Sequence, residues 1–527
     1  MPRNKFYITT PIYYVNAAPH IGHAYTQVIV DVIARYHRMS GEDVFFLTGT
    51  DEHGEKIEEA ALAAGFEKGK EKDFVDGIVK NFKEAWAELN IGYDGFIRTT
   101  DRAHKEVVQD FLERMKKKGD IYLGEYDGWF CTPCETFWTD TQAEGGVCPD
   151  CSRKVERIKE KNYFFKMSGY QDWLIKYIND NPEFIMPTFR KNEVMGFLKE
   201  GLNDLCISRP KKRSPWGVEL PFDEEYVVYV WFDALINYIS GPKIAGKFGD
   251  MWPPDIHMLA KDILRHHAVY WPVMLKSAGY DMPVTIFAHG WWKMGDEKMS
   301  KSKGNIVDPI AFSRRYGVDA VRYFLIKAVN LGLDGVFSED AFVAVYNSDL
   351  ANDLGNLLNR TLTMVEKYCD GVSPETTDPV SDEQARRSDD LRGSIKALLP
   401  CVDGKMRGKD LQLKQVLDEI MGLVNKANKY IEGSAPWEFS KKGDMGTIKL
   451  IMADLMEVLM VVTISIYPFM PSTASKMWTQ MGLEDICFEG KDREPFRNNV
   501  PKEGRMYPSG TKIDKGAPLF PRIESKE

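Results

Sequence analysis

Hydrophobic and polar residues in the first 115 positions alternate between strand-like and helix-like spacings. Short apolar runs predict strands at residues 6–10 and 43–50. Apolar residues three and four positions apart predict helices at residues 20–39, 55–64 and 72–89. Alternation of this kind is typical of a parallel sheet covered by helices, so we expect an α/β domain at the start of the chain.

The strand–helix pattern is interrupted at residues 116–225 and then resumes. The interruption contains four clustered Cys residues, several Gly and Pro residues and two runs of Lys and Arg. Beyond it, apolar runs predict strands at residues 225–231, 256–260 and 284–289. We therefore interpret residues 116–225 as a module inserted into the α/β domain.

From about residue 309 onward, the spacing of apolar residues is helical. Helix-like periodicity covers residues 341–367, 410–431 and 448–467, and a stretch rich in Asp, Thr, Ser and Pro predicts a loop at residues 370–383. A chain of 527 residues is too long for one ordinary core, so we expect an all-helical domain after the α/β domain.

Composition and charge fit a folded protein without a membrane span. The chain is 43% hydrophobic, and its net charge of -9 argues against a surface covered with nucleic-acid-binding charge, although a local basic stripe is compatible with it. The start of the chain lacks the apolar region of an export signal. Residues 451–470 are very apolar but contain Asp454 and Glu457, which predicts a buried helix. We expect a cytoplasmic protein that binds no membrane.

The first candidate site is Pro19-His20-Ile21-Gly22-His23, between a predicted strand and a predicted helix. Helix N-termini bind phosphate through backbone N–H groups, and Gly22 would let a ring or a phosphate approach the backbone closely. His20 and His23 are three residues apart, so both imidazoles can reach one ligand and stabilise charge that develops in a displacement reaction. The alternative is a helix start with two ordinary histidines.

The second candidate site is the cationic run Lys298-Met299-Ser300-Lys301-Ser302-Lys303-Gly304-Asn305, which follows a predicted strand. Mobile lysines of this type can close over a triphosphate and stabilise the pyrophosphate that leaves. The alternative is a solvated charged loop.

The two strings, in this order and on this strand–helix frame, resemble the paired motifs of class I aminoacyl-tRNA synthetases. Their flanks resemble the methionyl-tRNA synthetase family at residues 10–16 (TPIYYVN), 49–54 (GTDEHG), 229–234 (YVWFDA) and 260–263 (AKDI). The resemblance covers nearly the whole chain. It implies a Rossmann-like sheet that binds ATP with Mg²⁺ at its strand ends, followed by an anticodon-binding helical bundle. It also implies the joining of L-methionine first to ATP and then to tRNA(Met).

The resemblance assigns roles to individual residues. His20, His23, Lys298 and Lys301 would stabilise the transition state, with Gly22 and Asp262 also around ATP, and Asp51 would hold the methionine ammonium group. The methionine side chain would be enclosed by Ile12, Tyr14, Trp231, Ala234, Leu235, Tyr238, Ile263 and His267. Aromatic walls suit a thioether, but the sequence alone favours ordinary core positions for the aromatic residues and a helix N-cap for Asp262.

The clustered cysteines form two pairs, Cys131-x-x-Cys134 and Cys148-x-x-Cys151, separated by 13 residues. Four thiolates in two such pairs suit one tetrahedral Zn²⁺ with no open position, which indicates a structural metal. An empty or oxidised knuckle is the alternative. In the family that the chain resembles, a zinc knuckle of this insertion lies near the path of the tRNA acceptor end.

Three residues of the helical half are candidates for reading RNA. Asn356 and Arg360 are four residues apart on a helix face that points away from Leu354 and Leu358, and Trp437 can stack on an unpaired base. All three match anticodon-reading residues of the family. A solvated helix face and a packed tryptophan are the alternative.

We divide the chain accordingly. The expected parts are two halves of a catalytic domain (1–115 and 226–305), the insertion (116–225), a linker that contacts the tRNA stem (306–345), the anticodon-binding bundle (346–490) and a C-terminal tail (491–527). Many members of the family continue into a dimerising OB-fold domain that is missing here, so we expect a monomer. The competing functions are another nucleotidyltransferase on the same frame and a non-enzymatic zinc-knuckle RNA-binding protein.

Overall fold

The structure is a computed structural model of the chain. The residues that it describes are 5–132, 136–138, 140, 143–149, 152–295, 297–298, 307–375, 381–483 and 505–524. Contacts divide the chain into two compact units, which are described separately. The first unit comprises Met1–Val30, Val44–Ala87 and Ile91–His289, and the second comprises Asp31–Asp43, Glu88–Asn90 and Gly290–Glu527.

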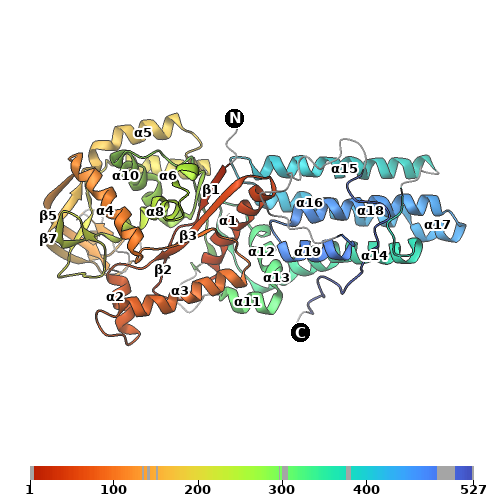
Figure 1. The fold of residues 1–527 in the computed structure, drawn as a ribbon, viewed down its shortest axis with the longest axis horizontal. Helices are drawn as coiled ribbons and strands as arrows, with labels where there is room; N and C mark the ends of the chain where they lie inside the picture. The colour runs from red at the N-terminus through yellow and green to blue at the C-terminus, as the bar shows by residue number, and fades with distance from the viewer. Residues whose placement is uncertain are drawn as a thin grey trace. The chain divides into compact units, whose positions relative to one another are not determined.

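A seven-stranded sheet forms the centre of the first unit (Figure 1). Its strand order is β2-β3-β1-β13-β14-β8, with β4 paired to β3. The pairs β1–β13, β13–β14, β14–β8, β2–β3 and β3–β4 are all parallel. The strands are β1 (Lys5–Thr9), β2 (Tyr13–Tyr14), β3 (Asp43–Asp51), β4 (Gly95–Arg98), β8 (Ile185–Met186), β13 (Ile256–Ala260) and β14 (Thr285–His289). Strand β3 is buried along almost its whole length, as expected for a parallel strand covered on both faces. The predicted parallel α/β fold is confirmed.

Helices cover both faces of this sheet. Figure 1 shows α1 and α3 on one face and α8 and α10 on the other. The helices of the first part of the chain are α1 (Ile21–Met39), α2 (Glu55–Ala63), α3 (Glu71–Glu88) and α4 (Arg102–Lys117). Those that follow are α5 (Gln171–Asp180), α6 (Thr188–Leu198), α7 (Val230–Leu235), α8 (Asn237–Ile244), α9 (Phe248–Met251) and α10 (Trp271–Ala278).

Two small antiparallel sheets lie mostly within residues 116–225, the segment predicted as an insertion. One has the order β6-β5-β7-β9 and the other β10-β12-β11. Their strands are β5 (Ile121–Cys131), β6 (Thr136–Trp138), β7 (Glu156–Phe165), β9 (Leu205–Cys206), β10 (Ser208–Pro210), β11 (Glu219–Leu220) and β12 (Asp223–Val228). Strand β8 of the same segment pairs with β14 in the central sheet, so the segment is not wholly separate from that sheet.

The strand predicted at residues 225–231 is only partly correct. Strand β12 ends at Val228, and α7 begins at Val230, so Trp231 lies on a helix. The backbone N–H groups of Phe232 and Asp233 both bond to the carbonyl oxygen of Tyr229, which closes the first turn. A short apolar run fits either element, and periodicity alone cannot separate them.

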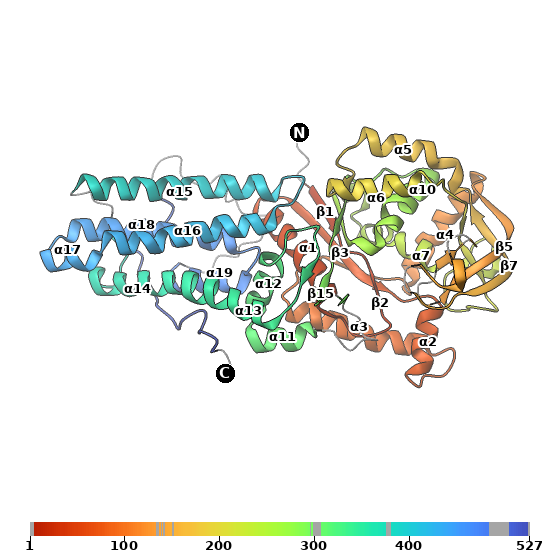
Figure 2. The same ribbon diagram turned by 180° about the vertical axis from the view of Figure 1, so that it is seen from behind.

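The second unit is mainly helical (Figure 2). Its helices are α11 (Pro309–Tyr316), α12 (Val318–Lys327), α13 (Glu339–Val345), α14 (Asn356–Cys369), α15 (Asp382–Met406), α16 (Leu413–Ser434), α17 (Pro436–Lys442), α18 (Met445–Ile466) and α19 (Pro471–Gln480). A small sheet of β15 (Trp292–Met294), β16 (Glu297–Lys298) and β17 (Gly335–Val336) accompanies them. The loop predicted at residues 370–383 ends earlier, because the Ser381 side chain accepts a bond from the N–H of Gln384 and starts α15.

The helix predicted at residues 341–367 is interrupted. Between α13 and α14 the backbone is π-helical over Tyr346–Gly355, which changes the helical register. The predicted apolar stripe of Leu350, Leu354, Leu357 and Leu358 is nevertheless buried.

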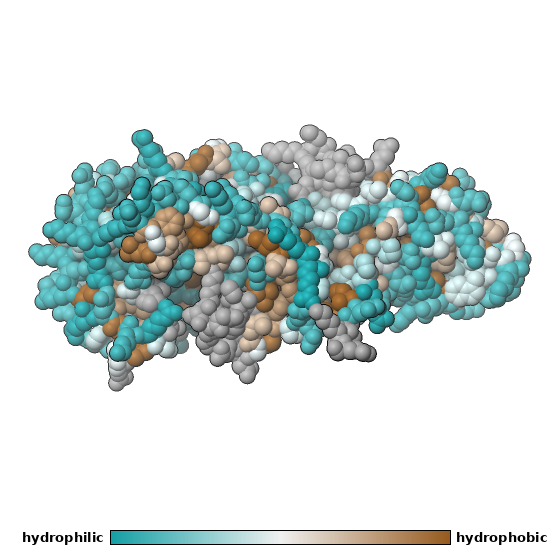
Figure 3. Space-filling model, turned by 90° about the horizontal axis from the view of Figure 1, so that it is seen from below, coloured by the Kyte–Doolittle hydropathy of each residue, from teal (hydrophilic) through white to brown (hydrophobic). Residues whose placement is uncertain are grey.

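On the face in Figure 3, hydrophobic atoms of the described residues form separate patches among hydrophilic residues. No helix in the described part of the chain is both long enough and apolar enough to cross a bilayer.

Candidate active site

The candidate site lies where the strand order of the parallel sheet changes direction. Strand β1 lies between β3, which follows it in the chain, and β13, which comes much later. Ligands of open parallel sheets bind at the carboxyl ends of the strands beside such a point. The start of α1 and the ends of β3 and β13 lie at this edge of the sheet.

His20 and His23 lie together at the start of α1, as predicted. Their imidazole rings stack with 3.8 Å between centroids and 21° between planes. The backbone N–H of His20 donates to Nδ1 of His23 (3.2 Å), and the N–H of Gly22 donates to Nδ1 of His20 (3.1 Å). Because each Nδ1 accepts a hydrogen bond, the proton of each neutral ring is on Nε2. Both rings therefore present an N–H donor, as a phosphate site requires.

Gly22 permits this arrangement. A Cβ atom at this position would lie 2.9 Å from Cε1 of His20, closer than side-chain carbons approach one another. This geometry is consistent with the prediction that Gly22 allows a ring or a phosphate to approach closely, and the ring beside it is the imidazole of His20. A larger residue would push His20 away from His23.

A cluster of three aromatic side chains packs against His23. Tyr13 of β2 packs edge-on against its ring at 5.0 Å between centroids, and Phe82 and Trp86 of α3 pack against Tyr13. Gln27 of α1 donates to the Tyr13 hydroxyl (3.3 Å) and so ties this cluster to α1, the helix that carries His23. The histidine pair is thus held by packing as well as by its backbone bonds.

Asp51 and Tyr14 come together at the carboxyl end of β3. The register of β2 and β3 places Tyr14 opposite Asp51, and Asp51 is only 2% exposed. Trp231 of α7 meets Tyr14 edge to face, with 6.2 Å between ring centroids and 89° between planes. The structure therefore brings a buried carboxylate and two aromatic rings to one place, as the sequence resemblance implied.

His266 is a residue that the sequence analysis missed. Its ring stacks on Trp231 with 3.9 Å between centroids and 20° between planes. Burial, followed by the nearby His267, lowers the pKa of His266 to about 3, so the ring is neutral at physiological pH. A neutral imidazole extends the aromatic wall that Trp231 and Tyr14 begin. The adjacent pair His266-His267 gives no signal of this contact in the sequence.

His267 and Tyr238 form a second side of the same region. The hydroxyl of Tyr238 donates to Nε2 of His267 (2.7 Å), while Nδ1 of His267 donates to the carbonyl oxygen of Ile263 (2.9 Å). These bonds fix the tautomer of the neutral ring. Burial lowers the pKa of His267 to about 4. The imidazole therefore adds a polar but uncharged surface.

The remaining candidates differ in how far the structure describes them. Ala234 and Leu235 are buried on α7, and Ile12 and Ile263 are half-buried against the core that contains Leu235 and Tyr238. Asp262 is exposed in a 3₁₀ turn directly after β13. Lys298 belongs to β16, but its side chain and all of Lys301 lie outside the described residues.

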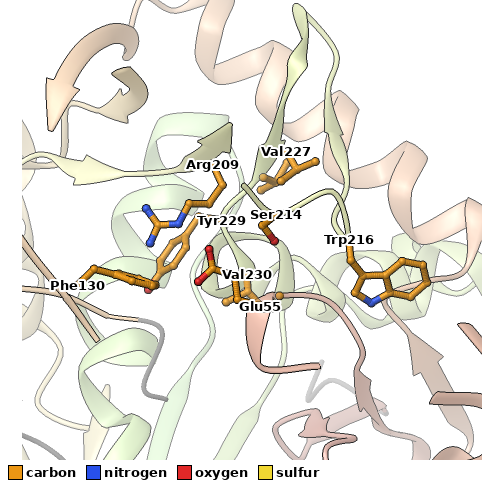
Figure 4. A pocket seen from close by; sticks show the side chains of 10 residues that line it. Glu55, Phe130, Arg209, Ser214, Trp216, Val227, Tyr229 and Val230 are labelled. Atoms are coloured by element: carbon orange, nitrogen blue, oxygen red, sulfur yellow. The ribbon is translucent and has the colours of Figure 1, made fainter. Parts of the chain in front are cut away.

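Arg209 is another residue that the sequence analysis missed. It is 5% exposed, its Nη1 lies 3.0 Å from Oε1 of Glu160, and its guanidinium lies 4.0 Å from the ring centroid of Phe130. Figure 4 shows it in a pocket with the Tyr229 ring and the Glu55 carboxylate. Val230, the neighbour of Trp231, also lines this pocket. Because Arg209 lies next to the run Lys211-Lys212-Arg213, the sequence does not distinguish this buried arginine from exposed basic residues.

Two of the four predicted zinc ligands lie within the described residues. Cys131 and Cys148 are both buried in one small cluster with Trp138 and Ala143. The N–H of Cys148 donates to the carbonyl oxygen of Arg153 (2.8 Å). Cys134 and Cys151 lie outside the described residues, among which no group of three or more metal-binding side chains occurs. Two buried thiols in one cluster fit half of a four-cysteine site.

The predicted RNA-reading residues lie at one end of the helical unit. Asn356 and Arg360 are one turn apart on α14, both half-buried, and Nη1 of Arg360 lies 3.8 Å from Oε1 of Glu432 on α16. Trp437 follows α16 on α17 and is 39% exposed. Figure 2 shows α14 and α17 at the same end of the bundle.

Comparisons with known proteins agree with one another. The family model described as tRNA synthetases class I (M) matches residues 6–160 and 152–362. The chain is 47% identical to the methionine–tRNA ligase of Caldanaerobacter subterraneus subsp. tengcongensis and 44% identical to that of Clostridium tetani, over 99% of this chain and 79% of each relative. A solved structure of Mycobacterium tuberculosis methionyl-tRNA synthetase in complex with methionyl-adenylate matches with a TM-score of 0.90 and 39% identity, over 98% of this chain and 100% of that one.

Proposed function

The chain belongs to the methionine–tRNA ligases, which are class I aminoacyl-tRNA synthetases, and we propose which of its residues carry out the two steps of the reaction. As a member of this family it activates methionine with ATP and charges tRNA with the product. The observation that carries the assignment of roles is the stacked pair His20–His23 at the start of α1. It lies on the same sheet edge as the carboxylate of Asp51 and the aromatic group around Trp231.

In the first step, a carboxylate oxygen of methionine attacks the α-phosphorus of ATP. A bond forms between that oxygen and phosphorus, the bond from phosphorus to the bridging β-phosphate oxygen breaks, and pyrophosphate leaves. The Nε2–H groups of His20 and His23 donate to phosphate oxygens as negative charge builds on them. Lys298 and Lys301 neutralise the leaving pyrophosphate, and Mg²⁺ accompanies ATP. Gly22 and Asp262 complete the ATP site, Asp262 by contacting the ribose.

Methionine is held by one charge contact and a largely apolar pocket. Asp51 accepts hydrogen bonds from the ammonium group, and its burial strengthens that contact. The pocket consists of Ile12, Tyr14, Trp231, Ala234, Leu235, Tyr238, Ile263 and His267, with His266 behind Trp231. Burial lowers the pKa values of both histidines, so neither imidazole adds a positive charge that would favour a polar or anionic side chain.

In the second step, a hydroxyl of the terminal tRNA ribose attacks the carbonyl carbon of methionyl-adenylate. An ester bond forms, the O–H bond of the ribose hydroxyl and the bond from that carbon to the phosphate oxygen break, and the proton and AMP are released. No protein nucleophile is required, so the protein contributes position and charge stabilisation. Asn356, Arg360 and Trp437 read the anticodon CAU by hydrogen bonds and stacking. Since charged tRNA is used in translation, we place the reaction in the cytoplasm.

The cysteine pairs would hold one structural Zn²⁺. Cys131, Cys134, Cys148 and Cys151 supply four sulfur ligands, which leave no position open for substrate. When bound, the metal would tie the two knuckles together and stabilise the small cluster of Cys131, Trp138 and Cys148. The site therefore supports the fold of the insertion and takes no part in the chemical steps.

The decisive experiment is ATP–pyrophosphate exchange with each of the twenty amino acids. Exchange with methionine alone is expected, and exchange with none would overturn the assignment. Lys301→Ala is expected to reduce the methionine-dependent rate by a factor of about 100 or more, since charge stabilisation of a transition state is commonly worth this much. Lys212→Ala removes an exposed lysine elsewhere in the chain and serves as the matched control. Equal rates in the two variants would remove Lys301 from the mechanism.

A further inference from the structure

A buried carboxylate joins two histidines, and two of these three residues are close in the chain to residues proposed for the methionine site. Oδ2 of Asp233 lies 2.7 Å from Nδ1 of His53, and its Oδ1 lies 2.9 Å from Nε2 of His104. All three residues are at most 2% exposed. None of them is among the residues assigned to the reaction above.

The network connects the two parts of the methionine site through the chain. His53 comes two residues after Asp51, just beyond the end of β3. Asp233 comes two residues after Trp231 and immediately before Ala234 on α7. The bond between His53 and Asp233 therefore ties the segment that carries the ammonium-binding carboxylate to the helix that carries the apolar wall.

The two histidines are anchored unequally. His104 of α4 has a second bond, because its Nδ1 lies 2.7 Å from Oγ of Ser240 on α8. For His53, no hydrogen-bond partner of Nε2 occurs among the described residues, and the ring otherwise packs edge-on against Trp216 at 5.6 Å between centroids. The orientation of His53 thus depends on Asp233 far more than that of His104 does.

Asp233 is an ionised acceptor for both rings. Burial alone would raise the pKa of its carboxyl group, but the contacts with His53 and His104 hold that pKa below its ordinary value. Each carboxylate oxygen accepts from a different ring, so neither histidine can take over the bond of the other. Charge-assisted bonds in a buried setting are among the strongest positioning contacts in proteins.

A second set of contacts holds the same segment from another side. The carboxylate of Glu52 bonds to Arg98 (2.6 and 2.9 Å), and the N–H of Glu52 donates to Oγ1 of Thr99 (2.9 Å). These contacts fix the end of β3 to the β4 side of the sheet. These contacts of Glu52 do not reach α7. The bond between His53 and Asp233, in contrast, joins the end of β3 to α7.

We propose that Asp233 is a positioning residue for methionine binding, which acts through His53 to set Asp51 at the correct distance and angle from Trp231 and Ala234. This inference rests on the proposed roles of Asp51 and Trp231. It places the specificity of the pocket partly in residues that do not touch the substrate, as supporting shells of binding sites commonly do.

The probe that tests this is L-methioninol, which keeps the ammonium group and the side chain of methionine but has no carboxylate to activate. Its affinity, measured by calorimetry, reports Asp51 and the apolar pocket alone. Asp233→Asn keeps the size of the side chain but replaces one acceptor oxygen with a donor. The expected result is a dissociation constant for methioninol at least ten times higher, with that for ATP within a factor of two. In exchange assays, KM for methionine rises tenfold or more while kcat changes less than threefold.

The matched control is Ser240→Ala, which removes the second bond of His104 and leaves the His53–Asp233 bond intact. Its methioninol affinity is expected to stay within threefold of the native value. Unchanged affinity in Asp233→Asn, an equal loss in Ser240→Ala, or an equal loss of ATP affinity would each overturn the proposal. If the native chain itself bound no methioninol and gave no methionine-dependent exchange, the proposed function would fail instead.

A pair of variants at His53 keeps the test decisive if Asp233→Asn does not fold. The amide nitrogen of Asn can occupy the place of Nδ1 and donate to Asp233, so His53→Asn is expected to retain methioninol affinity within threefold. His53→Ala removes the donor and is expected to lose affinity by tenfold or more. Equal affinities in these two variants would overturn the proposal, because both shorten the side chain and only one keeps the bond.

Discussion

The indole ring of Trp231 lies flat against the imidazole ring of His266, with 3.9 Å between their centroids. On another side Trp231 meets Tyr14 edge to face at 6.2 Å. The three rings make a continuous aromatic wall, the kind of surface that suits a soft and polarisable thioether. One member of this wall can take up a proton, and this gives the wall a dependence on pH.

Replacement of His266 by Phe should weaken the loss of stability in acid. Burial lowers the pKa of His266 to about 3, whereas an unfolded histidine titrates near 6.5. Between these pH values the unfolded state binds more protons, so the free energy of unfolding falls as the pH falls. One such group accounts for a slope of up to about 1.4 kcal/mol per pH unit. His266→Phe should therefore show a smaller drop in melting temperature between pH 6.5 and pH 4 than the native chain.

His266→Gln separates titration from apolarity in this experiment. Glutamine does not titrate, so its melting temperature should also fall less steeply in acid even if the variant is less stable at every pH. If the melting temperatures of the native chain and of both variants fell equally between pH 6.5 and pH 4, His266 would not be the source of the acid sensitivity.

Replacement of Asp51 by Asn should raise KM for methionine in ATP–pyrophosphate exchange by about 10- to 100-fold, because a charge-assisted bond is worth about 1.5–3 kcal/mol. Asp51 is buried, so water cannot replace the lost contact with the ammonium group. KM for ATP should stay within about threefold, since the charge lost faces methionine. Asp43→Asn, at the opposite end of β3, is the control and should behave as the native chain. A rise in both KM values to the same degree would remove Asp51 from the ammonium site.

Long and regular patterns predicted the fold well. The strand predicted at residues 256–260 coincides with β13, and the predicted helix 20–39 starts one residue before α1. The apolar run at 225–231 misled because a helix of one to two turns is too short to show a period, and the π-helical turn before α14 leaves no trace in the hydrophobic pattern.

The candidate site could be predicted where its residues are contiguous or belong to a recognisable string. His20 and His23 are neighbours on one helical turn, so their contact follows from helix geometry. Trp231 and His266, or His53 and Asp233, lie far apart in the sequence and meet only because α7 packs beside the ends of β3 and β13. Such contacts depend on tertiary packing, and neither composition nor spacing contains them.

The cysteine pairs should bind about one zinc ion per chain, measured by atomic absorption on purified protein. Cys148→Ser should lose this zinc, because a serine hydroxyl is a poor substitute for a thiolate, while methionine-dependent exchange stays within about threefold for a structural site. Cys206→Ser is the matched control, because Cys206 belongs to neither cysteine pair and burial raises the pKa of its thiol to about 12. Zinc retained in Cys148→Ser, or lost equally in Cys206→Ser, would contradict the assignment.

Arg360 should matter for charging tRNA and not for activating methionine. It lies on α14 in the second unit, one turn from Asn356, whereas His20, His23 and Asp51 belong to the first unit. Arg360→Ala should lower kcat/KM for aminoacylation by about 10- to 100-fold, which corresponds to about 1–3 kcal/mol for a bidentate contact to a base. The rate of ATP–pyrophosphate exchange should not change. Lys396→Ala, which removes an exposed positive charge from α15, should affect neither reaction.

A tRNA with an altered anticodon distinguishes base reading from simple charge attraction. If Arg360 contacts a base, Arg360→Ala lowers charging of the native tRNA much more than charging of the altered tRNA, so the preference for the CAU anticodon shrinks. If Arg360 contacts only phosphate, both tRNAs lose activity by the same factor and the preference stays as it was. Arg360 is half-buried on α14, with its Nη1 3.8 Å from Oε1 of Glu432, and we expect the first outcome. An unchanged preference in Arg360→Ala would contradict a role in reading the anticodon.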